Sequence, residues 1–393
     1  MKRRAFVKSG VAGAAGFVAI NNASLASDAG EESNIIYRTL GKTGIKLPVI
    51  SFGVMRSDSS ALVQAAYEAG MKMFDTANGY QNGRNEEMLG AFFSSKPRDS
   101  FVLATKVKPS GVDFRTGLPT KDTTAEDFLT KFDTSLARLK MEYVDILYMH
   151  AADCAELVNH REIVNAMLDL RKKGKTRFIG VSTHKNEPQV IKAMIEAGIW
   201  DVVLTSYNFS QSHTEEMNKV LQQAGEAGLG VVAMKTLAGG FLDKERTKPV
   251  NVKAAIKWVL SNPNVHTVIP GMTTFDHLNT DIQIMSDISL SEEEKKELLI
   301  ASAQSGLYCN ACSSCKGSCP AGLPLPEIMR AYMYMYGYRD MSQAAGLLSE
   351  TGISSNPCKD CDECQVNCVR GFDIRNKVTD ISRLAEVPSD FIS

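Results

Sequence analysis

The sequence lacks an excess of charge of either sign and any long apolar run. Among its 393 residues, 44 Lys and Arg stand against 45 Asp and Glu, a formal net charge of −1. A nearly neutral chain has no general electrostatic attraction for nucleic acid, so no nucleic-acid partner is expected. No stretch reaches the roughly 18 apolar residues of a membrane-spanning helix, so no such helix is predicted either.

Cysteine is scarce along most of the chain. Of nine cysteines, Cys154 stands alone, and the other eight form two tight groups near the C-terminus. A chain of this length can bury a core without disulfides, and disulfides that close loops would be spaced more widely. The clustering therefore predicts metal ligands.

The first 26 residues have the layout of an export signal. MKRRAFVK is basic, SGVAGAAGFVAI is weakly apolar, and SLA at 24–26 offers a small-x-small cleavage site. The pair Arg3-Arg4, followed by Phe6, resembles the twin-arginine signal of bacteria. We therefore expect a twin-arginine signal peptide over residues 1–26, a periplasmic or otherwise exported protein, and contact with a membrane only during export. A merely basic N-terminal segment is the alternative.

Strand-length apolar runs alternate with amphipathic helical stretches from about residue 48 to 285. Eight runs have the character of strands: 49–55, 73–77, 101–107, 144–150, 178–183, 202–208, 230–236 and 267–272. Eight strand–helix units in succession predict an α/β fold, the (β/α)8 TIM barrel. The alternative is a doubly wound open sheet, which would prefer a G-x-G-x-x-G turn where this sequence has MRSDSS.

Two segments flank the predicted barrel strands. Residues 35–48 predict a β-hairpin, with Gly41 and Gly44 near its turn, that covers the N-terminal end of the barrel. The barrel domain is expected over residues 27–300. A small α-helical, ferredoxin-like domain that carries the clustered cysteines is expected over residues 301–393.

Three neighbouring predicted strands end in side chains that can carry chemistry. Asp75 and Tyr80 follow the second strand, Lys106 lies on the third, and His150 ends the fourth. The C-terminal ends of barrel strands meet on one face, where barrel active sites lie. A buried Lys needs a partner such as Asp75, and a Lys⁺ beside a phenol should lower the pKa of Tyr80. The set predicts a proton donor for a carbonyl oxygen.

In their sequence context these residues resemble the Asp-Tyr-Lys-His tetrad of the aldo-keto reductases. The similar stretches are RTLGKTGIKLPVISFG (38–53), FDTANGY (74–80), NEEMLG (85–90), IGVSTH (179–184) and VIPGMTTFDHL (268–278). The resemblance implies an NAD(P)H-dependent oxidoreductase that interconverts a small carbonyl compound and an alcohol. It assigns Tyr80 as the general acid, Lys106 as the group that lowers its pKa, Asp75 as the partner of Lys106, and His150 as the residue that orients the carbonyl.

The resemblance also implies where a nicotinamide cofactor, NADP or NAD, would bind. The expected contacts are Ser182, Thr183, Asn208, Lys235, Leu237, Gly239, Gly271 and Thr273. Thr183, Leu204 and Met234 depart from the family's usual Asn, Gln and aromatic residue. The turn at 235–240 can wrap a diphosphate with its backbone N–H groups. The loop at 271–274 lacks the Lys and Arg common in NADPH-preferring members, so the choice between NADP and NAD stays open.

The clustered cysteines form two runs. The first, Cys309-x2-Cys312-x2-Cys315-x3-Cys319-Pro, has bacterial ferredoxin spacing, and Cys358-x2-Cys361-x2-Cys364-x3-Cys368 repeats it without the proline. A zinc site would favour C-x-x-C pairs separated by long gaps. The runs resemble a two-cluster ferredoxin module with a helical insertion, in which each fourth cysteine ligates the other run's cluster. That resemblance implies two [4Fe–4S] clusters, one on Cys309, Cys312, Cys315 and Cys368, the other on Cys319, Cys358, Cys361 and Cys364.

Two interpretations of the whole chain stay open. In the first, the barrel uses nicotinamide, and the clusters exchange electrons with it or with an electron-transfer protein. In the second, the barrel uses nicotinamide weakly or not at all, and the clusters are structural or dock an electron-transfer partner. Export weighs against the first unless the nicotinamide is bound before export or electrons enter through the clusters.

Overall fold

The computed structural model describes residues 34–113, 116–241, 247–303, 308–309, 312–361 and 363–392. The predicted signal peptide over residues 1–26 lies outside these ranges. The chain from Ile35 onward forms one compact unit. No helix within the described ranges is both long enough and apolar enough to cross a membrane.

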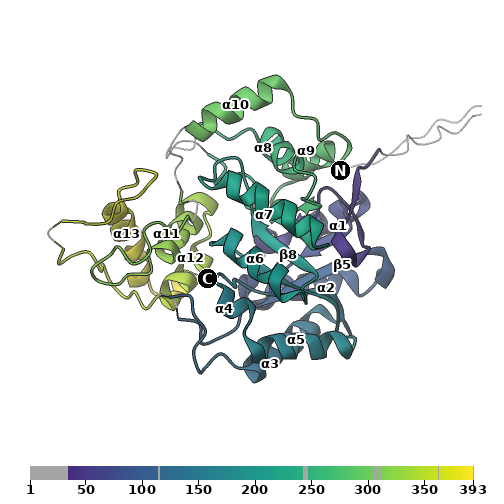
Figure 1. The fold of residues 1–393 in the computed structure, drawn as a ribbon, viewed down its shortest axis with the longest axis horizontal. Helices are drawn as coiled ribbons and strands as arrows, with labels where there is room; N and C mark the ends of the chain where they lie inside the picture. The colour runs from purple at the N-terminus through teal and green to yellow at the C-terminus, as the bar shows by residue number, and fades with distance from the viewer. Residues whose placement is uncertain are drawn as a thin grey trace, which may run out of the picture. The chain divides into compact units, whose positions relative to one another are not determined.

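Eight parallel strands form the centre of this unit (Figure 1). They are β3 (Phe52–Gly53), β4 (Met73–Asp75), β5 (Val102–Val107), β6 (Val144–Met149), β7 (Thr176–Thr183), β8 (Val202–Ser206), β9 (Gly230–Met234) and β10 (Thr267–Val268). Each strand pairs with the next, and Ile50 bridges Val268 in parallel, so the sheet nearly closes into a barrel. The predicted (β/α)8 fold is confirmed, with strand ends that differ by a few residues.

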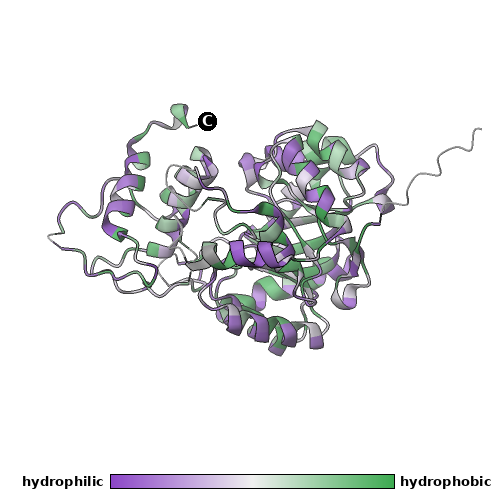
Figure 2. Cartoon of the chain, turned by 90° about the horizontal axis from the view of Figure 1, so that it is seen from above, coloured by the Kyte–Doolittle hydropathy of each residue, from purple (hydrophilic) through white to green (hydrophobic). Residues whose placement is uncertain are grey.

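Helices connect the strands and cover the barrel. They are α1 (Ser60–Glu68), α2 (Arg84–Phe93), α3 (Ala125–Leu139), α4 (Ala155–Val158), α5 (Arg161–Lys172), α6 (Glu187–Ala197), α7 (Thr214–Glu226), α8 (Val252–Leu260), α9 (Phe275–Ser286) and α10 (Glu292–Ala303). In α3 the Thr124 hydroxyl accepts from the Asp127 N–H at the start, while Phe128 and Phe132 are buried against the strands. Figure 2 shows the result, with apolar strands inside and polar helix faces outside.

The alternation of side chains along each strand places the predicted catalytic residues in the barrel interior. On β5, Leu103 and Val107 pack among the residues between strands and helices, whereas Val102 and Ala104 belong to the barrel interior. Because successive side chains point to opposite faces, Lys106 continues the interior row at the C-terminal end. The same period places Asp75 above Met73 on β4 and His150 above Tyr148 on β6.

The predicted hairpin is present at the opposite end of the barrel. β1 (Tyr37–Thr39) and β2 (Lys46–Pro48) pair antiparallel, and Leu40 packs into the barrel interior. The Lys42 N–H donates to Gly228 O at 2.7 Å. A Cβ at Gly41 would lie 2.5 Å from the Gly228 carbonyl oxygen, so glycine is needed for this close approach to the start of β9.

The cysteine-rich segment, residues 308–392, is helical where it is regular. It contains α11 (Leu325–Tyr332), a π-helix η5 (Met333–Tyr338), α12 (Met341–Glu350), α13 (Ile374–Ser382) and the short 3-10 turns η6 (Arg383–Glu386) and η7 (Ser389–Phe391). Ile328, Leu348, Val378 and Ile381 are buried in its own apolar core. The helices predicted between the two cysteine runs are therefore present as α11, η5 and α12.

One buried charge in the barrel wall generates a stability prediction. Asp281 on α9 is 3% exposed, and burial raises its pKa to about 7. Its carboxyl group is thus more easily protonated in the folded chain than in the unfolded one. The penalty is absent below about pH 4, grows between about pH 4 and 7, and levels off above pH 7 at about 4 kcal/mol at most.

We therefore expect Asp281→Asn to increase the free energy of unfolding at pH 8 and to have little effect at pH 4. Denaturant unfolding at both pH values measures the difference. Asp276→Asn is the matched control, because Asp276 lies exposed on the same helix. An Asp281→Asn gain that is equal at both pH values would contradict the assignment of a buried, titrating carboxyl group.

Candidate functional site

Lys106 is the centre of the site at the C-terminal end of the barrel. Its ammonium group donates to Asp75 Oδ1, to the Thr76 carbonyl oxygen at 2.7 Å and to Tyr80 Oη at 3.4 Å. Lys106 and Asp75 are 1% and 2% exposed. The Tyr80 ring meets the His150 ring edge-on, with centroids 5.9 Å apart. The four residues predicted as the tetrad thus lie together around one buried point.

The loop after β4 holds Tyr80 by a run of left-handed backbone. Gln81, Asn82 and Gly83 have φ values of 50°, 56° and 92°. Gly83 suits this position because its φ of 92° is a backbone conformation that residues with a Cβ rarely adopt. Arg138 in turn donates to the Asn78 carbonyl oxygen at 2.9 Å, which fixes the approach to Tyr80.

The pKa of Tyr80 is raised well above its ordinary value, in contrast to the net lowering expected beside Lys106. Burial is the main cause, and the negative charge of Asp75 adds to it. Because Asp75 pairs with Lys106, the positive charge at the phenol is largely cancelled. The Tyr80 hydroxyl therefore stays protonated through neutral pH, as a proton donor must.

His150 of the tetrad lies beside a second histidine, His184, which is 8% exposed. The His150 and His184 rings have centroids 5.9 Å apart. Burial lowers the pKa of each well below its ordinary value, and the charges of Lys106 and, farther along the chain, Arg330 lower the pKa of both. Both imidazoles are therefore neutral near pH 7, and each can donate one N–H.

The residues expected around a nicotinamide ring fit that group in part. Ser182 lies in the interior row of β7, and its hydroxyl accepts from the Ala151 N–H at 3.0 Å. The Thr183 hydroxyl is engaged with Asp153 at 3.0 Å and with the Lys185 carbonyl oxygen. Ser206, on β8, is buried and its hydroxyl has no hydrogen-bond partner. Ser182 and Ser206 therefore offer donors for a carboxamide, and Ser206 has no sequence motif that marks it.

The expected diphosphate turn meets the cysteine-rich segment. Asn208 braces this turn by donating to the Lys235 carbonyl oxygen at 3.2 Å, and the Gly240 N–H donates to Leu237 O at 2.9 Å. A Cβ at Gly239 would lie 2.6 Å from Cδ2 of Tyr308. Tyr308 thus packs on the glycine that the resemblance assigns to the cofactor.

The loop expected at the ribose is exposed. Gly271 and Thr273 are both exposed, and the Thr273 N–H donates to His277 Nδ1 at 3.3 Å. Asp281 is buried in α9 and does not present its carboxylate to this loop, whereas Asp276 is exposed at the start of the helix.

The eight clustered cysteines line two separate hollows in the cysteine-rich segment. Cys309, Cys312, Cys315 and Cys368 line the first hollow, and Cys319, Cys358, Cys361 and Cys364 line the second. Burial raises the pKa of Cys315 to about 11, with further contributions from Cys312 and Cys368. The fourth cysteine of each run thus lies with the first three of the other run.

No disulfide joins the cysteines, all nine of which the structure describes. Among the described residues, no group of three or more His, Cys, Asp or Glu is arranged to hold a single metal ion. Cys154 lies apart, where its thiol contacts the Gly117 carbonyl oxygen at 3.0 Å and accepts from the Leu157 N–H at the start of α4.

Comparisons with known proteins concern the barrel. A profile of the Aldo/keto reductase family matches residues 50–254. The L-galactose dehydrogenase of Arabidopsis thaliana is 26% identical over 297 residues, 65% of this chain and 90% of its own. The L-glyceraldehyde 3-phosphate reductase of Escherichia coli O157:H7 is 24% identical over 322 residues, 67% of this chain and 91% of its own.

The fold is also similar to solved structures. An aldo-keto reductase from Bacillus halodurans, in its holo form, aligns with a TM-score of 0.56 and 22% identity over 68% of this chain and 97% of its own. At that identity the likeness supports the barrel fold. The cysteine runs lie outside the residues that the family profile matches.

Proposed function

This chain belongs to the aldo/keto reductase family of NAD(P)H-dependent oxidoreductases, and from that membership we propose that it interconverts a small carbonyl compound and an alcohol at Tyr80. One observation carries the proposal: a buried ammonium group, Lys106, bonded to both Asp75 and Tyr80, with Tyr80 edge-on to His150. This is the arrangement that proton donation to a carbonyl oxygen needs.

Each residue has a distinct part in carbonyl reduction. Reduced nicotinamide, when bound, supplies a hydride to the carbonyl carbon. Tyr80, protonated because its pKa is raised, donates its proton to the carbonyl oxygen. Lys106 then stabilises the phenolate that remains, and Asp75 holds Lys106 in place. His150, neutral at pH 7, donates an N–H that positions the same oxygen.

Tyr80→Phe removes the proton donor and keeps the ring. We expect kcat/KM for the best carbonyl in a panel of small aldehydes to fall by about 10²–10⁴, as for loss of a general acid. Nicotinamide absorbance follows turnover, and nicotinamide affinity should be unchanged. Tyr37→Phe, at an exposed tyrosine of the hairpin, is the control. Full activity in Tyr80→Phe would place the chemistry elsewhere.

We also propose that the two hollows of the cysteine-rich segment hold one [4Fe–4S] cluster each. The ferredoxin spacing of the runs supports this, as do the two sets of four thiols. Four cysteine sulfurs around a four-iron cube lie farther apart than ligands of one ion at about 2.3 Å. Such clusters supply one-electron transfer when bound.

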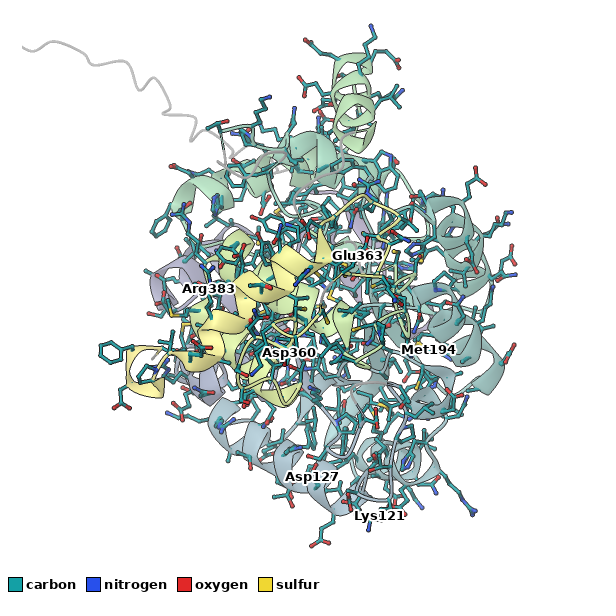
Figure 3. All side chains as sticks on the ribbon, turned by 90° about the vertical axis from the view of Figure 1, so that its left-hand side faces the viewer. Lys121, Asp127, Met194, Asp360, Glu363 and Arg383 are labelled. Carbon is teal, nitrogen blue, oxygen red and sulfur yellow. The ribbon has the colours of Figure 1, made fainter. Side chains whose placement is uncertain are left out.

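A site for an electron-transfer protein is proposed at the second run. Cys364 is exposed, as are Asp360 and Glu363, which Figure 3 shows on the side of the segment turned toward the viewer. An exposed, charged rim suits a transient electron-transfer contact.

Protein purified without oxygen should contain about eight iron and eight sulfide per chain. Cys312→Ala and Cys368→Ala should each lower the iron content toward about four and leave the same paramagnetic resonance spectrum, because both line the first hollow. Cys154→Ala is the control and should keep the full content. Zinc without sulfide, or different residual spectra for the two variants, would contradict the assignment.

We propose finally that residues 1–26 direct export by the twin-arginine route, which places the protein in the periplasm or outside the cell. The basic pair, the weakly apolar stretch and the small-residue cleavage site support this. This route exports folded proteins, so the clusters would be inserted before export.

Replacing Arg3 and Arg4 together with Lys should retain the protein in the cytoplasm, since the receptor reads the arginine pair while the charge is unchanged. Cell fractionation and immunoblotting measure the distribution. Lys8→Arg, which also preserves charge, is the control and should export normally. Normal export of the double variant would indicate another route.

A further inference from the structure

The cysteine-rich segment closes over the C-terminal end of the barrel. It is bonded to loops that follow β3, β5 and β7: Arg56 to the Tyr338 carbonyl oxygen at 2.7 Å, Lys108 to Glu350 at 2.5 Å, Lys316 to the Thr116 carbonyl oxygen at 2.6 Å, and Lys185 to Glu327. These are the loops on which barrel active sites are built. The segment therefore lies against the end of the barrel at which the tetrad lies.

Helix α11 is the part of this segment that lies between the first cysteine hollow and the barrel. Pro326 and Met329 line the first cysteine hollow. Glu327, on the other side of the helix, pairs with Lys185 of the barrel. Arg330 follows Pro326 by four residues and Glu327 by three, so it lies between these two on the helix surface. Arg330 therefore lies next to the contact that Glu327 makes with the barrel.

The Arg330 guanidinium has donors without acceptors. Its Nε is buried and has no hydrogen-bond partner, and no described carboxylate forms an ion pair with it. The acidic groups nearest to it are already engaged. Asp153 Oδ1 accepts from the Thr183 hydroxyl at 3.0 Å and from the His184 N–H at 2.8 Å, and Glu327 is paired with Lys185.

The surroundings of Arg330 form a cationic patch beside the tetrad. The charge of Arg330 contributes to the lowered pKa values of His150 and His184, after burial. Lys235 lies in the same patch, and burial together with Arg330 lowers its pKa to about 8. The Nδ1 of His184 is also buried without a partner. Unpaired buried donors of this kind are costly unless a ligand satisfies them.

We propose that Arg330 binds an anionic oxygen group, a carboxylate or a phosphate, of the carbonyl or alcohol substrate. The inference rests on the proposed function, because it assumes that the substrate's reacting carbon lies at Tyr80 and His150. A guanidinium suits this task, since it presents parallel donors that match two oxygens of such a group. The substrate class is therefore an acidic carbonyl compound, and its specificity residue comes from the cysteine-rich segment instead of the barrel.

Binding of simple anions tests the site without turnover. Calorimetry on the full chain should detect binding of benzoate or inorganic phosphate, and benzamide should bind more weakly than benzoate. Arg330→Gln should weaken anion binding at least tenfold, and Arg330→Lys should restore part of it. Arg339→Gln, at an exposed arginine nine residues later, is the matched control. No anion binding to the unaltered protein, or equal losses in both Gln variants, would overturn the proposal.

Two further measurements distinguish an anionic group of the substrate from the diphosphate of the cofactor. Arg330→Gln should raise KM for 4-carboxybenzaldehyde at least tenfold and leave KM for methyl 4-formylbenzoate unchanged. The dissociation constants of NADH and NADPH should stay unchanged in the variant. A loss of nicotinamide affinity would assign Arg330 to the cofactor diphosphate and overturn the proposal. If the unaltered enzyme reduces neither aldehyde, the proposed function fails on this panel, while the binding measurement still decides the anion site.

Discussion

The buried pair of Lys106 and Asp75 is the interaction on which the site depends. Neither charge could be buried alone in the barrel without a large free-energy cost, and removing either partner would strand the other. The pair also joins the ends of β4 and β5, because Lys106 bonds to the Thr76 carbonyl oxygen as well as to Asp75. Its near-neutrality has a chemical consequence. Because the ammonium group next to Tyr80 is paired with Asp75, the Tyr80 hydroxyl keeps its proton.

The protonated state of Tyr80 is the state that the proposed carbonyl reduction uses. Reduction of a carbonyl needs a proton donor, which a phenol with a raised pKa supplies at any pH near neutrality. Tyr334 and Tyr338 of the cysteine-rich segment add to the raised pKa of Tyr80, after burial and Asp75. The enclosure by the cysteine-rich segment thus acts on the catalytic proton as well as on the substrate.

Sequence patterns predicted the barrel and the tetrad because both follow from short-range rules. Alternation along each strand fixes which side chains face the axis, so Asp75, Lys106 and His150 could be placed from their positions on three runs. The sign of the Tyr80 pKa shift could not be predicted, since it depends on how completely Asp75 offsets Lys106. Ser206 and Arg330 carry no motif. The position of Arg330 depends on the ion pair between Lys185 and Glu327, which lie 142 residues apart in the sequence.

The arrangement of the cysteines connects the barrel site to the cysteine-rich segment. Cys368 lies with the first run and Cys319 with the second, and α11 contributes Pro326 and Met329 to the first hollow and Leu325 to the second. If the hollows hold clusters as proposed, metal insertion would fix the position of α11. Arg330 lies on that helix, so completion of the substrate pocket would follow loading of the cysteine-rich segment.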